Sequence, residues 1–154
     1  MKKNVTIARA LKEKNRLAGR LAQIRALIGK ENSREKNVPR GIDVQASFEV
    51  AKVLKRRLVD VKAAIAAANK PIVAKIVELD EMKAEIAWLN GLETREGVFK
   101  QANYGGIVTE EYDAVIKKAD LLEELKKLQK RADELQDALD EFNASTKVEI
   151  EMDD

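Results

Sequence analysis

Apolar residues recur at steps of three and four along most of the chain, and this spacing constrains the fold more than any other feature. The clearest run follows steps of 4, 3, 3, 4, 3, 4 and 3 and consists of Val44, Phe48, Ala51, Leu54, Leu58, Val61, Ile65 and Ala68. Residues at these steps fall on one side of an α-helix of 3.6 residues per turn. The spacing is also close to that of a coiled coil.

Similar runs and helix-boundary residues divide the chain into four predicted helices, at about 6–28, 43–69, 71–91 and 109–143. Thr6, Asp43 and Thr109 are suitable N-caps, and Pro71 suits the first turn of a new helix. Gly19, inside the first of these helices, is expected to mark the close approach of a neighbouring segment. We therefore expect an all-α fold, an elongated antiparallel helical bundle or coiled coil of four helices in a single domain over residues 1–154.

A minor β element is compatible with two short segments. In residues 147–152 the apolar residues Val148, Ile150 and Met152 alternate with charged ones, which is typical of a strand. Residues 98–104 are the expected partner strand, followed by a turn at Gly105-Gly106.

The composition excludes several chemistries. The 154 residues include no cysteine and no histidine, so zinc fingers, disulfide scaffolds and Ser-His-Asp triads are excluded. We expect no metal, no cofactor and no enzymatic activity, since no nucleophile–base pair is recognisable. The longest uncharged apolar stretch, residues 63–68, is too short to cross a membrane, and Met1-Lys2-Lys3 does not lead into a signal peptide. A cytoplasmic protein of a bacterial cell or phage-infected host is expected.

Charge is divided unequally along the chain. Residues 1–70 contain 18 basic and six acidic residues, a net charge of +12, whereas residues 71–154 contain 11 basic and 21 acidic residues, a net charge of −10. Two halves of opposite sign can pair with each other, within one chain or between chains. The basic half can instead bind an anionic partner.

The strongest candidate site is a basic patch on the first two predicted helices. It consists of Arg9, Lys12, Arg16, Arg20, Lys52, Lys55, Arg56 and Arg57. One hypothesis is sequence-independent nucleic-acid binding, with these residues contacting phosphates. The favoured hypothesis is structural pairing or a protein partner, because charges beside helices of coiled-coil spacing commonly select the partner.

A second candidate surface is an apolar stripe on the last predicted helix. It consists of Leu122, Leu125, Leu128, Leu135, Leu139 and Phe142. A helix of about 50 Å cannot bury such a stripe within a compact protein of this size, so we expect a homo-oligomer.

Clusters of acidic residues and an isolated tryptophan are given ordinary structural interpretations. Glu78, Glu81 and Glu85 recur at helical spacing, as do three acidic residues near the C-terminus, and we interpret both sets as solvated faces. Trp88 lies off the apolar stripe of its helix, and we expect a partly buried residue at the edge of the core.

Three stretches carry a resemblance to a known family: Ala8–Lys14, Ala64–Pro71 and Leu135–Asn143. With them the chain resembles the septicolysin-like family of small helical proteins of bacteria and phages, whose function is uncharacterised. Of the family's Ile-Asn-x-x-Asn signature, this chain has Ala66 in place of the first asparagine and keeps Asn69. The resemblance implies an all-helical oligomeric protein and identifies no catalytic residue.

The function expected from these observations is that of a non-enzymatic helical interaction or assembly protein, which self-associates and binds a protein partner. One version is a phage-encoded factor that acts on a host protein. The alternative is electrostatic nucleic-acid binding by the basic N-terminal half.

Overall fold

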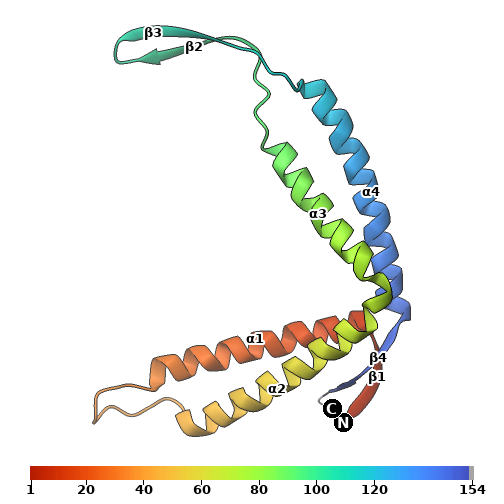
Figure 1. Ribbon diagram of the computed structural model, residues 1–154. Helices are drawn as coiled ribbons and strands as arrows, with labels where there is room; N and C mark the ends of the chain where they lie inside the picture. Colours follow the sequence, from red (N-terminus) through yellow and green to blue (C-terminus); the bar gives the residue numbers. More distant parts are fainter. Residues whose placement is uncertain (153–154) are drawn as a thin grey trace. The chain divides into compact units, whose positions relative to one another are not determined.

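The computed structural model describes residues 1–152, apart from the side chain of Asn103. The elements follow in the order β1 (Lys2–Thr6), α1 (Ile7–Glu31), α2 (Val44–Ala68), the short 3₁₀-helix η1 (Lys70–Ile72), α3 (Val73–Asn90), β2 (Gly97–Asn103), β3 (Gly106–Tyr112), α4 (Lys118–Ser145) and β4 (Lys147–Glu151) (Figure 1).

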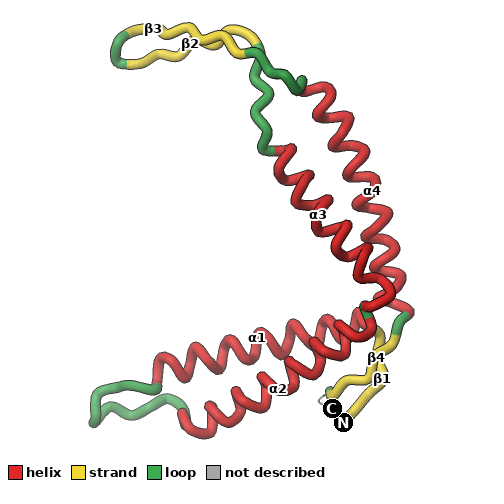
Figure 2. Tube along the Cα trace, viewed as in Figure 1, coloured by secondary structure: helices red, strands yellow, loops and turns green. Residues whose placement is uncertain are grey.

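The prediction of an all-α four-helix bundle is wrong, because the chain also forms two antiparallel sheets of two strands each (Figure 2). The expected pairing of residues 98–104 with 147–152 is wrong as well. β2 pairs with the adjacent β3, from Gly97 opposite Tyr112 to Asn103 opposite Gly106. β4 instead pairs with β1, with Val148 opposite Val5.

The fourth helix begins at Lys118 and not near Thr109, because residues 106–112 form β3. Ile107, Val108, Thr109 and Tyr112 all favour strands, and this preference outweighs the resemblance of Thr109 and the acids after it to a helix start. Gly106 has a φ of +120°, which an L-residue rarely adopts, and it supports the tight turn of the β2–β3 hairpin.

The chain divides into two compact units. The first consists of the described residues of Met1–Val73 and Leu139–Asp154, and the second consists of Ala74–Ala138. Helix α4 begins in the second unit and ends in the first. The prediction of a single domain stays a prediction.

The first unit is built on the hairpin of α1 and α2, which lie side by side (Figure 1). Its two helices begin at the predicted caps: the Thr6 hydroxyl accepts a hydrogen bond from the Arg9 amide, and the Asp43 carboxylate accepts one from the Ala46 amide. The apolar stripes meet in one core, whose buried members include Ile7, Ala10, Leu17, Leu21, Leu54, Leu58, Val61 and Ile65.

The β1–β4 pair adds to this core at the ends of the chain. Val5, Val148 and Ile150 are buried in the same cluster, while Asn4 of β1 and the charged residues of β4 are exposed. The amide of Met152 donates to the carbonyl of Met1 at 3.0 Å, so the pairing extends to the N-terminus. The alternating pattern of residues 147–152 thus indicates a strand correctly, with a different partner.

The second unit contains α3, most of α4 and the β2–β3 hairpin. Leu79 and Leu89 of α3 are buried, as are Leu121, Ala132 and Leu135 of α4. Arg131 of α4 donates to the carboxylate of Glu78 of α3 at 2.8 Å, and Lys83 donates to Gln136 at 3.2 Å. α3 and α4 are therefore neighbours, as Figure 1 also shows.

Aromatic residues and an arginine pack near the base of the β2–β3 hairpin. The rings of Phe99 and Tyr112 meet edge to face at 5.5 Å, and the guanidinium of Arg95 lies 4.5 Å from the centre of the Tyr112 ring. The hydrogen bond to Glu110 raises the pKa of the Tyr112 hydroxyl. Within residues 1–152, no helix is long and apolar enough to span a membrane.

Candidate binding groove on the α1–α2 hairpin

The connection between α1 and α2 is organised by the buried carboxylate of Glu31. Arg34 donates to this carboxylate at 2.8 Å and the amide of Gly41 donates to it at 3.0 Å. The hydrogen bond from Gly41 is the largest cause that lowers the pKa of Glu31, and the charge of Arg34 adds to it. Arg40 further donates to the backbone carbonyl of Glu31 at 3.0 Å. These bonds tie residues 34–41 to the end of α1 and so order the loop end of the hairpin.

A second buried carboxylate, that of Glu13, binds two arginines of the predicted patch. Arg16 donates to it through Nε at 2.7 Å and through Nη2 at 2.6 Å, and Nη2 of Arg57, from α2, lies 3.6 Å away. Glu13 is not among the site residues predicted from the sequence. It was detectable as an acidic residue at a position between Ala10 and Leu17 where the helical spacing favours an apolar residue, and it lies three residues before Arg16. Arg16 and Arg57 are therefore partly neutralised within the hairpin.

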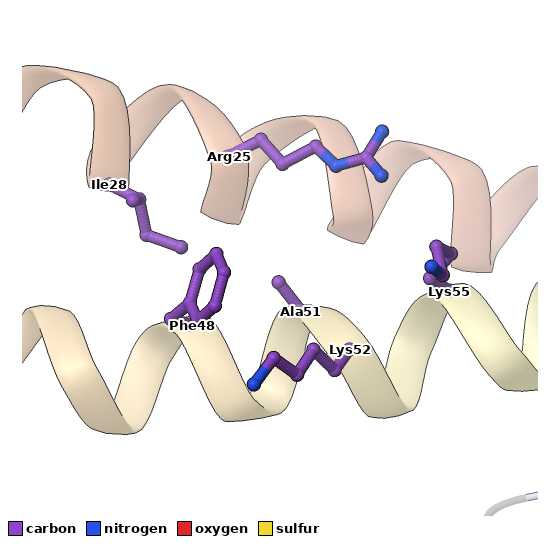
Figure 3. Close-up of a pocket in the computed structure, with 6 residues that line it drawn as sticks. All are labelled: Arg25, Ile28, Phe48, Ala51, Lys52 and Lys55. Atoms are coloured by element: carbon purple, nitrogen blue, oxygen red, sulfur yellow. The ribbon is translucent and has the colours of Figure 1, made fainter.

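Lys52 and Lys55 of α2 and Arg25 of α1 border a groove between the two helices. We call it the basic groove; it has a volume of about 290 Å³ and is lined by Arg25, Ile28, Phe48, Ala51, Lys52 and Lys55. Ile28 of α1 and Phe48 of α2 point toward each other in the space between the helices, and Ala51 lies beside them (Figure 3). Phe48 is 48% exposed, although it belongs to the apolar stripe of α2.

The charge of the basic groove is positive. Three of its lining residues are cations, and none of the six described residues that line it is acidic. The ammonium of Lys52 lies 4.7 Å from the centre of the Phe48 ring, within the range of a cation–π contact. It also pairs with Glu49 at 2.7 Å, but both side chains of this pair are more than half exposed and solvent screens it. An apolar floor with a cationic border suits an anionic, partly apolar partner.

A second cavity of about 520 Å³ lies next to the basic groove and shares Lys52 with it. It adds Arg20 from α1 and Arg56 and Arg57 from α2, together with Val50 and Val53. The structure therefore brings together five residues of the predicted patch, namely Arg20, Lys52, Lys55, Arg56 and Arg57.

Other members of the predicted patch lie elsewhere. Arg9 and Lys12 are exposed on α1 but line neither of these two cavities. Arg25, which the prediction omitted, lines the basic groove. It was detectable as the residue three positions before Ile28, on the side of α1 next to the apolar stripe.

The predicted self-association stripe of α4 does not form one open face. Leu135 and Leu139 are buried, and Phe142 packs on the core of the first unit. Leu125 and Leu128 are half-buried, and Leu122 is exposed. Self-association through this stripe stays a prediction.

Trp88 differs from its expected position at the edge of the core, since it is 61% exposed on α3. In the acidic set on α3, Glu78, Glu81 and Glu85 are all exposed, as expected for a solvated face, and Glu78 also pairs with Arg131. Among the described residues, no group of three or more acidic residues is placed to hold a metal ion.

Comparison with known proteins adds no relative. No family model matches the chain, and neither a curated protein nor a solved structure matches it significantly. The resemblance to the septicolysin-like proteins therefore stays a prediction.

Proposed function

We propose that this chain is a non-enzymatic helical interaction protein, and that its α1–α2 hairpin binds an acidic surface of a protein partner in the cytoplasm. The observation that supports the proposal is the basic groove, in which Arg25, Lys52 and Lys55 border the exposed ring of Phe48. Cations at a rim accelerate and orient binding, while a partly exposed aromatic ring supplies the apolar contact that gives affinity.

The groove favours a protein partner over nucleic acid because half of its lining is apolar. Proteins that bind single strands stack successive bases on several aromatic rings. Phe48 is the sole aromatic residue among the first 87 of the sequence. Phosphate contacts alone would need only the cations and would leave Phe48, Ile28 and Ala51 without a role.

The proposal is tested by fluorescence anisotropy with two labelled probes. One probe is an amphipathic helical peptide of about 18 residues, in which glutamates flank a row of leucines. The other probe is a DNA duplex of about 20 base pairs. The protein is titrated into each probe at about 50 mM salt and at higher salt concentrations. We expect the peptide to bind more tightly than the duplex. The variant Lys52→Glu/Lys55→Glu/Arg56→Glu is expected to weaken peptide binding by about tenfold or more.

A matched control changes the same number of charges on α4. Lys118, Lys126 and Lys130 are all exposed, and their replacement by glutamate leaves the groove intact. This control is expected to bind the peptide within about twofold of the original chain. Equal losses in both variants would mean that only net charge matters, and tighter binding of the duplex would favour the nucleic-acid hypothesis instead.

A further inference from the structure

The outward side of α3 carries apolar residues that no described element covers. Val77 is 56% exposed and Trp88 is 61% exposed, and Ala84 is exposed between them. At 100° per residue these three positions fall within about 40° of one another around the helix. The buried Leu79 and Leu89 lie on other sides of α3. α3 thus has a second apolar strip in addition to the one it buries.

Acidic residues border this strip on both sides. By the same helical geometry, Asp80 lies on one side of the strip and Glu81 on the other, with Glu85 one turn further along. All three are exposed. The basic residues of α3, Lys75 and Lys83, lie at other angles, and Lys83 donates to Gln136 of α4. We call Val77, Asp80, Glu81, Ala84 and Trp88 the outer face of α3; among the described residues of this face none is basic.

The outer face of α3 and the basic groove are complementary. Each has apolar residues in its centre and charges at its border, and the charges are of opposite sign, namely Arg25, Lys52 and Lys55 in the groove and Asp80 and Glu81 on α3. An amphipathic helix in an apolar groove is a common form of recognition. A largely exposed tryptophan is the residue type that most often dominates the energy of such contacts.

We propose that the basic groove of one copy binds the outer face of α3 of a second copy. This inference rests on the proposed function, because it names the acidic partner of that same groove. The two surfaces differ, so the contact is heterologous: each copy offers one groove and one α3, and the assembly grows as a ring or a filament. The excess of positive charge in residues 1–70 and of negative charge in residues 71–154 then attracts neighbouring copies.

The first experiment measures mass by light scattering and sedimentation across micromolar concentrations. We expect the original chain to assemble, and salt to weaken the assembly. The groove variant Lys52→Glu/Lys55→Glu and the α3 variant Val77→Ser/Trp88→Ser are each expected to weaken self-association by about tenfold or more. All four positions are exposed, so the variants retain the fold, which circular dichroism verifies. The control Lys118→Glu/Lys126→Glu has the same charge change as the groove variant and is expected to assemble normally.

The decisive experiment mixes the two variants. The groove variant keeps an intact α3 and the α3 variant keeps an intact groove, so an equimolar mixture is expected to form a one-to-one dimer and nothing larger. A face-to-face contact between identical surfaces would give no such rescue. In addition, the charge exchange Lys52→Glu/Lys55→Glu/Asp80→Lys/Glu81→Lys within one chain is expected to restore assembly.

The outcomes separate this inference from the proposed function. A chain that binds the acidic peptide through its groove but stays monomeric overturns the α3 contact and leaves the proposed function standing. Assembly that neither variant weakens, or a mixture without dimers, also overturns the contact. Competition between the acidic peptide and assembly supports it. If the original chain does not bind the acidic peptide, and the groove variant assembles as well as the original chain, both the α3 contact and the proposed function are contradicted.

Discussion

The side chain of Arg16 makes two hydrogen bonds to the buried carboxylate of Glu13, one turn earlier in α1. The same carboxylate lies 3.6 Å from Arg57 of α2, so it connects the two helices of the hairpin in the middle of their apolar contact. Glu13 occupies the place in the stripe where Ile7, Ala10 and Leu17 would favour an apolar residue. A buried ion pair of this kind is costly to break and can often be replaced by apolar residues.

The first prediction concerns this pair. Replacement of Glu13 by Leu is expected to lower the free energy of unfolding by about 2 kcal/mol, because Arg57, whose side chain is 14% exposed, loses a nearby carboxylate. The double variant Glu13→Leu/Arg57→Leu is expected to regain most of this loss. Urea denaturation measures all three proteins. A double variant no more stable than Glu13→Leu would show that the two side chains do not act together; Glu35→Leu, in the exposed loop, is the control.

The second prediction concerns acid and the hairpin loop. The pKa of Glu31 is lowered from its ordinary value of 4.5, chiefly by the hydrogen bond from the Gly41 amide. Folding therefore favours the charged form, so this stabilisation is complete above the ordinary pKa and is lost as the pH falls through the lowered one. The variant Glu31→Gln is expected to be less stable at neutral pH and to lose less stability on acidification. Urea midpoints from about pH 7 to about pH 3 measure this difference, and parallel pH curves for both proteins would contradict it.

The third prediction tests whether the strands β1 and β4 pack on the core of the first unit. Ile150 of β4 is buried in the core that contains α1 and α2, and its replacement by Ala is expected to lower the free energy of unfolding by about 3 kcal/mol. Its neighbour Glu149 is exposed and pairs at 3.1 Å with Lys2, whose side chain is also exposed. Glu149→Ala is therefore expected to change stability by less than about 1 kcal/mol. Similar losses in thermal or urea denaturation would mean that β4 does not pack as described.

The fourth prediction compares two glycines. An added Cβ at Gly19, in the middle of α1, meets no atom within 4 Å, so the expected close neighbour is not there. Gly19→Ala is therefore expected to raise the free energy of unfolding by about 1 kcal/mol, because alanine favours the helix.

Gly106 also has space for a Cβ, but its φ of +120° strains any L-residue. Gly106→Ala is expected to weaken the β2–β3 hairpin locally, which faster amide exchange in residues 97–112 would show. Unchanged exchange there would contradict the prediction.

Much of the helical structure could be predicted because it depends on local spacing and on end residues. The apolar residues from Val44 to Ala68 correspond to α2, and Thr6 and Asp43 cap α1 and α2 as predicted. Helix α2 ends just before Pro71, also as predicted. Helix formation needs only neighbours three and four residues apart, and these are visible in a sequence. The strands were less predictable. Lys2–Thr6 contains one buried apolar residue, Val5, and becomes a strand because β4, almost a whole chain away, supplies its hydrogen bonds.

The candidate site, too, has features that the sequence shows and features that depend on how the helices pack. From the sequence alone came the division of charge at residue 70 and the presence of cations beside the apolar stripe of α2. Only the tertiary structure decided which cations border a groove, because the pairing of α1 with α2 sets Arg25 and Ile28 opposite Phe48 while Glu13 takes up Arg16 and Arg57. It also decided that Trp88 and Val77 stay exposed while Leu79 and Leu89 are buried, since α3 has apolar residues on two sides and the sequence does not show which side a neighbour covers. Spacing along a helix determines which residues share a face, whereas the neighbour that packs on the helix determines which face stays open.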